Sequence, residues 1–296
     1  MRLGCAVLLT TITLGLAPRP AAQERPDTPV FRASVDMVSV AAVVRDRRGR
    51  VVPSLSREDF EVFDAGARRT ILDLRGDALA PISLAILVDG SGSMAVGHVL
   101  DAARHAGADV LSTLDPVRDE AALFTFDSRL LELQDFTNDF GPIRMRLEDL
   151  EAYGTTSLYD AIADTAKHVS RFATRRRAIL VLTDGADTTS RLSPAEVSGL
   201  ASSFDVPVYV LALAETVAGG ETPLASLARW TGGEYLPAGN PALVRAAVRQ
   251  VTSELRHQYV LAFEPSGSPG WRRVEVRTRR PGLTVRTRSW YLADAR

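Results

Sequence analysis

The sequence predicts an α/β fold: a Rossmann-like, doubly wound and mostly parallel sheet, joined to a small β-sandwich-like domain. Between residues 81 and 257, apolar strand-like runs alternate with long helical segments, which is typical of βαβ units. Short alternating patterns occupy both ends of the chain, at 30–74 and 259–292. Neither end has enough strands to form a core alone. We therefore expect the N- and C-terminal strands to pair in one β domain.

Residues 1–22 are predicted to be a secretory signal peptide. Arg2 supplies the positive n-region, Cys5–Leu16 form an apolar segment, and small residues lead to a cleavage point near Ala22–Gln23. The apolar segment is shorter than the about 20 residues that span a bilayer. We therefore expect a secreted, periplasmic or cell-envelope protein with no transmembrane segment in the mature chain.

Composition excludes several classes of function. The 296 residues carry 35 Lys and Arg against 36 Asp and Glu, and this formal net charge of −1 gives no reason to expect nucleic-acid binding. Cys5 is the only cysteine and would leave with the signal peptide. Disulfides, thiolate metal sites and cysteine nucleophiles are therefore excluded from the mature chain. Its core or bound ions must stabilise it.

The N-terminal segment, residues 23–80, is predicted to contain short strands. Val38–Val44 is rich in β-branched residues. Further along, Phe60 and Val62 alternate with polar residues, and Asp64–Gly66 supplies a hairpin turn. We expect Phe60 and Val62 to face a core.

The middle segment, residues 81–257, is predicted to form the α/β domain. Ile82–Asp89 is a near-continuous apolar run, as expected of a strand that is covered on both faces. An antiparallel edge hairpin is expected near 126–133. The other predicted strands span 121–126, 178–183 and 206–213, and the predicted helices span 98–114, 157–172, 194–204, 224–230 and 241–257.

The C-terminal segment, residues 258–296, returns to β alternation. Val274 and Val276 alternate with charged residues, and we expect Trp271 to pack and Trp290–Tyr291 to close the β core. The arginines of this segment form either a basic patch for an anionic polymer or membrane, or the solvated face of alternating strands. The second interpretation is favoured. These arginines are Arg272, Arg273, Arg277, Arg279, Arg280, Arg286 and Arg288.

Three polar stretches fall where strands end or helices begin. They are Asp89-Gly-Ser91-Gly-Ser93 after the first apolar strand, Gly154-Thr155-Thr156-Ser157 before a helix, and Thr183-Asp184-Gly185 after another strand. Ligands of open α/β sheets bind outside the carboxyl ends of strands. Side chains that offer only oxygen select hard cations such as Mg²⁺, Mn²⁺ or Ca²⁺. Taken alone, the second stretch reads as a helix N-cap and the third as a turn.

Together the three stretches resemble the von Willebrand factor type A (VWA) family. Its metal-ion-dependent adhesion site (MIDAS) combines D-x-S-x-S with a distant Thr and a distant Asp. The resemblance covers residues 81–257, and the flanking strands look like a bacterial secreted subgroup that has a β domain around this module. It implies that hydroxyls bind the metal, while the two carboxylates bind it directly or through water. The implied metal ligands are Asp89, Ser91, Ser93, Thr156 and Asp184.

We expect an exported, non-enzymatic protein-binding or cell-adhesion module. The resemblance implies an open coordination position on the metal, which an acidic side chain of a protein partner fills. The alternative is a structural or assembly component of the cell envelope in which the metal only stabilises the fold. A third reading, hydrolytic activity, would show as turnover of phosphate or ester substrates that depends on Asp89.

Other site readings are weaker. His98 and His105 are seven positions apart on one helical face, but no third zinc ligand is evident. Asp89 lacks the second carboxylate that an aspartyl phosphatase nucleophile needs two residues on, because that position is Ser91. Ser91 lacks the glycine of a G-x-S-x-G hydrolase elbow, because Asp89 stands there.

Overall fold

The computed structural model describes residues 37–173, 175–214, 222–265, 267 and 269–293. The predicted signal peptide, residues 1–22, lies outside the described residues. Among the helices in the described ranges, none combines the length and the apolar character that a bilayer span requires.

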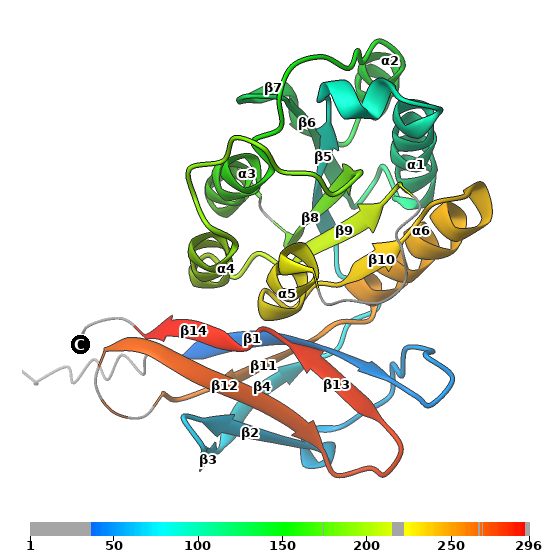
Figure 1. Cartoon of the computed structure of the whole chain (residues 1–296). Coiled ribbons are helices and arrows are strands. Elements are labelled where there is room, and N and C mark those ends of the chain that lie inside the picture. The colour runs from blue at the N-terminus through cyan, green and yellow to red at the C-terminus, as the bar shows by residue number, and fades with distance from the viewer. Residues whose placement is uncertain (1–36, 174, 215–221, 266, 268, 294–296) are drawn as a thin grey trace, which may run out of the picture. The chain divides into compact units, whose positions relative to one another are not determined.

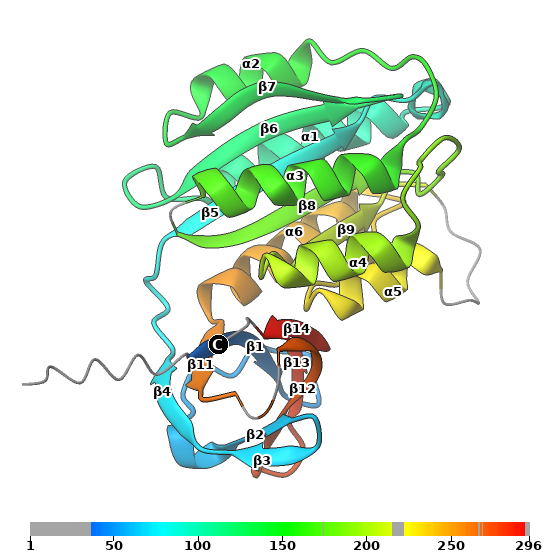
Figure 2. The ribbon, with the colours of Figure 1, turned by 90° about the vertical axis from the view of Figure 1, so that its left-hand side faces the viewer.

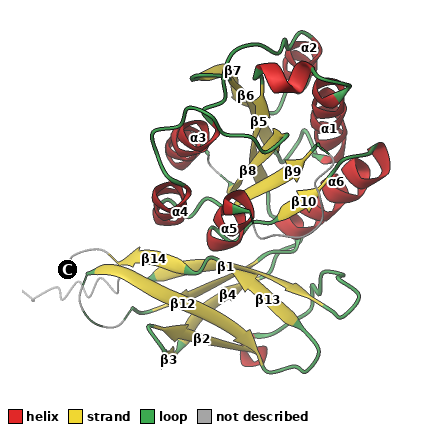
Figure 3. Cartoon of the chain, in the orientation of Figure 1, coloured by secondary structure: helices red, strands yellow, loops and turns green. Residues whose placement is uncertain are grey.

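Within the described residues, a six-stranded sheet forms the centre of the α/β domain (Figures 1 and 3). Its strand order is β10-β9-β8-β5-β6-β7, and all neighbours are parallel except β6 and β7. The predicted mostly parallel sheet with an antiparallel edge is therefore confirmed. The strands are β5 (Ile82–Asp89), β6 (Glu120–Phe126), β7 (Leu130–Thr137), β8 (Arg176–Thr183), β9 (Val208–Ala212) and β10 (Tyr235–Pro237).

Helices cover both faces of this sheet, as Figure 2 shows from the side of α3 and α4. One face packs against α1 (Val99–Thr113), α2 (Gly141–Glu148) and α6 (Pro241–Arg256). The other packs against α3 (Leu158–Phe172), α4 (Pro194–Ser203) and α5 (Pro223–Trp230). The sheet is doubly wound, as the sequence predicts.

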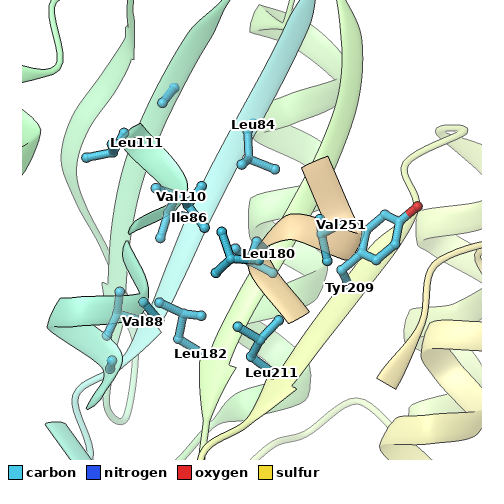
Figure 4. Packing of buried hydrophobic residues seen from close by; sticks show 14 of the residues in the cluster. Leu84, Ile86, Val88, Val110, Leu111, Leu180, Leu182, Tyr209, Leu211 and Val251 are labelled. Atoms are coloured by element: carbon cyan, nitrogen blue, oxygen red, sulfur yellow. The ribbon is translucent and has the colours of Figure 1, made fainter. Parts of the chain in front are cut away.

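Alternate residues of β5 supply the two halves of the core. Leu84, Ile86 and Val88 belong to the cluster on the α1 and α6 side (Figure 4), whereas Ala85 and Leu87 belong to the opposite cluster. All five are fully buried. Because full burial of one large aliphatic side chain contributes about 1.5–3 kcal/mol, this strand anchors the loop that follows it.

The described N- and C-terminal strands form two four-stranded antiparallel sheets, with the orders β13-β1-β11-β4 and β14-β12-β2-β3. Strand β1 pairs with β11 and β13, and β2 pairs with β12. The two ends of the chain therefore pair as predicted. The strands are β1 (Val38–Arg45), β2 (Phe60–Asp64), β3 (Ala67–Arg69), β4 (Ile71–Arg75), β11 (Tyr259–Phe263), β12 (Gly270–Thr278), β13 (Thr284–Thr287) and β14 (Trp290–Ala293).

The core of the β sheets corrects one expectation. Val274, Val276 and Tyr291 are buried as predicted. Trp290 is instead 40% exposed, whereas Trp271, which is 48% exposed, packs against Gly199 of α4 as expected. Because side chains alternate along a strand, the inward position of Tyr291 turns Trp290 outward, and the prediction that Trp290 closes the core is wrong.

An ion-pair cluster joins the β13-β1-β11-β4 sheet to the α/β domain. Arg45 in β1 and Arg286 in β13 both pair with Glu234 and with Glu254 of α6. The Glu254 side chain is fully buried, and Gln250 donates to both glutamates, at 3.0 Å to Glu234 and 3.3 Å to Glu254. Two arginines and two glutamates thus neutralise one another there.

Candidate functional site

Asp89 ends the strand at which the sheet reverses its winding. Strand β5 lies between β8 and β6, so the crevice outside its carboxyl end is the expected ligand site of such a sheet. The Asp89 side chain is fully buried. Its Oδ1 accepts a bond from the Ser91 N–H at 3.0 Å, and its Oδ2 accepts one from the Thr183 hydroxyl at 2.6 Å. These bonds fix the orientation of the carboxylate.

The electrostatic environment of Asp89 is unusual for a buried carboxylate. Burial raises the pKa of Asp89 above its ordinary value, and the negative charge of Asp184 acts in the same direction. The hydrogen bonds from Thr183 and Ser91 oppose this rise. Among the described residues, no arginine, lysine or histidine forms an ion pair with Asp89 or Asp184. The negative charge at this end of β5 is therefore not compensated by a side chain.

The two serines after Asp89 lie side by side. The Ser91 and Ser93 hydroxyl oxygens are 3.1 Å apart, with Ser91 buried and Ser93 exposed at the start of the short 3₁₀ helix Gly92–Ala95. Gly90 permits this turn, because a Cβ there would lie 2.8 Å from the Thr125 hydroxyl. The loop thus presents one buried and one exposed hydroxyl beside a buried carboxylate.

The second predicted stretch is bonded to the first. Gly92 N–H donates to the Gly154 carbonyl at 3.1 Å, and Tyr153 N–H donates to the Gly90 carbonyl at 2.8 Å. Gly154 has a φ of 83°, a backbone conformation that residues other than glycine rarely adopt. These backbone bonds bring the loop that carries Thr156 against the loop that carries the serines.

The loop that follows the third stretch is bonded to the second stretch, and Thr183 of the third stretch is bonded to the first. The Thr156 carbonyl accepts from the N–H groups of Thr188 and Thr189 at 2.9 and 3.0 Å, and Thr156 N–H donates to the Thr188 hydroxyl at 3.0 Å. The Thr183 hydroxyl accepts from Gly185 N–H at 2.9 Å in addition to its bond to Asp89. All three predicted stretches therefore meet at one edge of the sheet.

The N-terminus of α3 is not capped by Thr156 or Ser157 side chains. Leu158 N–H instead donates to the Asp187 carboxylate at 2.9 Å, and Tyr159 N–H donates to the Ser190 hydroxyl at 3.0 Å. The interpretation of the second stretch as a side-chain N-cap is therefore wrong. The hydrogen bonds that Thr156 makes to described residues use its backbone, and the residue is only 3% exposed.

Three residues of this edge were not identified as functional from the sequence. Thr183 orients Asp89, while Asp187 and Ser190 cap α3. The only sequence signal for Thr183 is its place between a buried strand and Asp184. Asp187 and Ser190 gave no signal, because they contact a helix start about thirty residues earlier.

The donors at this edge are oxygen atoms only. Within the described ranges, no group of three or more His, Cys, Asp or Glu side chains is placed to hold a metal. His98 lies 3.4 Å from Asp101, and His105 bonds the Asp101 carbonyl at 2.7 Å, so both contact their own helix. Nothing there supports a zinc site. Two carboxylates and three hydroxyls suit a hard cation instead.

A family model described as the von Willebrand factor type A domain matches residues 84–186. The match begins in β5 and runs past β8, so it includes all three polar stretches. The chain contains a VWA domain. A comparison with curated proteins finds no match.

Solved structures agree with the VWA fold. A von Willebrand factor type A structure from Catenulispora acidiphila is 14% identical, with a TM-score of 0.51, and the match covers 88% of this chain and 74% of that one. Proximal thread matrix protein 1 from the mussel byssus is 15% identical, with a TM-score of 0.50, over 64% of this chain and 49% of that one. An aerotolerance-related membrane protein from Bacteroides fragilis is 19% identical, with a TM-score of 0.48, over 59% and 98%. At these identities the first two likenesses show the fold alone.

Proposed function

We propose that this chain is an exported, non-enzymatic protein whose VWA domain binds a divalent cation and uses it to capture a carboxylate of a protein partner. VWA domains commonly act in protein–protein interaction. The cation would be Mg²⁺, or Mn²⁺ or Ca²⁺, because these ions prefer oxygen ligands. The residues that would hold it are Asp89, Ser91, Ser93, Thr156 and Asp184.

The uncompensated charge of Asp89 carries this proposal. A buried carboxylate without a cationic partner is costly, by several kcal/mol after the surroundings relax. Asp184 adds a second negative charge close enough to raise the pKa of Asp89. A divalent cation beside these two groups would reverse that cost, and this explains why so unfavourable an arrangement persists in the fold.

The remaining donors explain the preference for an acidic partner. Ser91, Ser93 and Thr156 offer neutral hydroxyls, and where the two carboxylates act through water the atoms that touch the ion would be mostly neutral. A cation with few anionic ligands attracts a further anionic oxygen. An acidic side chain on a partner supplies such an oxygen without any covalent step.

Export follows from the predicted signal peptide at residues 1–22, which would place the protein outside the cytoplasm, in the envelope or beyond it. Cation binding would also suit a mature chain without cysteine, because a bound ion stabilises the fold where disulfides are absent.

Removal of the Thr156 hydroxyl tests the proposal. Thr156→Val keeps the side-chain shape, and α3 is capped by other residues, so the fold should persist. We expect Mg²⁺ to raise the melting temperature of the wild-type protein but not of Thr156→Val. We also expect a protein partner to be captured from cell-envelope extract in Mg²⁺ and lost in EDTA or with Thr156→Val.

Thr165→Val is the matched control, because the Thr165 hydroxyl is buried in α3 without a hydrogen-bond partner among the described residues. It should retain both responses. Partner capture that survives EDTA would refute cation-dependent binding. If Mg²⁺ raised the melting temperature but partner capture were unchanged by EDTA and by Thr156→Val, the metal would only stabilise the fold of an envelope component. Turnover of phosphate or ester substrates that is lost with Asp89 would favour an enzyme.

A further inference from the structure

The outer face of the β14-β12-β2-β3 sheet contains a hollow of about 480 Å³. Aromatic and charged side chains line it together, namely Phe63, Trp271, Trp290, Arg273 and Glu275. Two of the three tryptophans in the sequence are therefore found here. None of the residues that line the hollow is a proposed ligand of the cation.

Strand register places the two tryptophans on the same face. Trp271 pairs with Leu292, and Arg273 pairs with Trp290, so Trp271 and Trp290 are diagonal neighbours on adjacent strands. Both rings remain about half exposed, and Leu292 beside them is 45% exposed. Large apolar side chains gathered on an exposed sheet face are typical of a binding surface.

Charge on this face is balanced except at one residue. Arg277 pairs with Glu275 at 2.6 Å, and Arg272 pairs with the buried Asp64 at 2.8 Å. Arg273 is exposed and forms no ion pair with any described residue. The positive charges of Arg273 and Arg277 both act on Glu275, so this face keeps one excess positive charge. Arg273, whose strand position is paired with Trp290, is free of a salt bridge within the described chain and can pair with a carboxylate.

We propose that this hollow binds a polysaccharide chain that carries carboxylates, such as one built of uronic acids. The apolar C–H face of a sugar ring stacks on tryptophan, because partly positive hydrogens meet the negative face of the indole. Arg273 pairs with the sugar carboxylate, and Glu275 accepts hydrogen bonds from sugar hydroxyls. The arginines of the C-terminal strands are thus mostly paired, and Arg273 is the member that acts on an anionic polymer.

The shape of the hollow favours a sugar over a membrane or a second copy of the chain. Its volume falls within the range of about 300–1,000 Å³ that is typical of small-ligand sites. Membrane insertion needs aromatic rings that protrude, whereas Trp271 and Trp290 are about half covered and line a concavity.

Tryptophan fluorescence of the full chain tests the proposal. In a Trp230→Phe background, both remaining tryptophans line the hollow. We expect titration with hexagalacturonate to give a saturable change in emission, and cellohexaose, a neutral hexasaccharide, to bind at least about tenfold more weakly. Arg273→Gln and Trp290→Ala should each weaken hexagalacturonate binding at least about tenfold. Trp290 is the better choice than Trp271, which also lies against Gly199 of α4.

Arg279→Gln is the matched control, because Arg279 is paired with Glu61 at 3.3 Å and neither residue lines the hollow. It should bind hexagalacturonate like the parent protein. Absence of saturable binding, or binding that Arg273→Gln leaves unchanged, would overturn the proposal. So would binding to phosphatidylglycerol vesicles without binding to hexagalacturonate, or a dimer in sedimentation that Trp290→Ala dissociates.

Discussion

At the scale of single residues, Asp89 shows how hydrogen bonds can orient a charge without neutralising it. The Ser91 N–H and the Thr183 hydroxyl occupy both carboxylate oxygens, yet the pKa of Asp89 is still raised, first of all by burial. A carboxylate that only stabilised the fold would be better replaced by a neutral amide. The cation that we propose would offset this charge.

Asp89→Asn separates these two roles. The amide oxygen can accept from the Ser91 N–H, and the amide NH2 can donate to the Thr183 hydroxyl, which in the wild-type protein is itself the donor; both contacts persist while the charge disappears. In EDTA we expect the free energy of unfolding to rise by about 1–2 kcal/mol, because a buried unpaired charge is removed. The stabilisation by Mg²⁺ should vanish. Urea denaturation with and without Mg²⁺ measures both effects.

Asp149→Asn is the control for Asp89→Asn, since Asp149 is exposed at the end of α2. It should leave the Mg²⁺ response unchanged. If Asp89→Asn destabilised the protein in EDTA and still responded fully to Mg²⁺, Asp89 would be a structural residue and the cation site would lie elsewhere.

At the scale of elements, the start of α3 is held by another loop. Asp187 and Ser190, which follow β8, accept the first N–H groups of α3, while Thr156 and Ser157 precede that helix. The capping residues thus tie the candidate ligand Thr156 to the loop that carries Asp184. The negative charge of Asp187 also interacts favourably with the positive N-terminal end of the helix dipole.

Asp187→Ala should therefore weaken both fold and cation binding. Loss of an N-cap costs about 0.5–2 kcal/mol in free energy of unfolding, and the Thr156 loop should lose order with it. We expect the Mg²⁺ affinity, measured by the shift in melting temperature, to fall as well. Asp164→Ala is the control, because Asp164 lies on the exposed side of α3 and pairs with Lys167. Equal Mg²⁺ affinity in both variants would contradict the coupling.

The sequence predicted most elements closely but missed the helix α2 and the strand β10. The apolar strand β5 and the helix α3 match their predicted ranges to within one residue, because long periodic runs identify them. Helix α2 was missed because it buries only Ile143 and Leu147, too few for a visible period. The three-residue strand β10 was missed for the same reason.

The sequence predicted the candidate ligands of the site, but not the hydrogen bonds that hold their loops together. Asp89, Thr156 and Asp184 stood out, because a hydroxyl or carboxylate directly after a buried strand or before a helix is placed at the sheet edge. The bonds that join their loops involve residues such as Thr183 and Asp187, whose contacts arise only on folding. Trp290 was misassigned because alternation fixes which residues share a face but not which face is buried.

At the scale of the whole molecule, the VWA domain and the β sheets are joined by buried charge. Glu254 of α6 lies fully buried between Arg45 of β1 and Arg286 of β13. Burial acts to raise the pKa of Glu234 in the same cluster, but Arg45 and Arg286 hold it below its ordinary value. Since α6 also leads into β11, displacement of this helix would disturb both the ion pairs and the sheet.

Glu254→Gln tests whether this cluster makes the two parts unfold together. The substitution leaves Arg45 and Arg286 sharing Glu234 alone, and a broken buried pair costs about 3–5 kcal/mol. We expect one calorimetric transition for the wild-type protein and two for Glu254→Gln, because the β sheets and the VWA domain retain separate cores. Glu234→Gln should cost less, because the Glu234 side chain is 27% exposed and water can solvate the remaining charges. Two transitions already in the wild-type protein would show that the cluster orients the parts without coupling their stability.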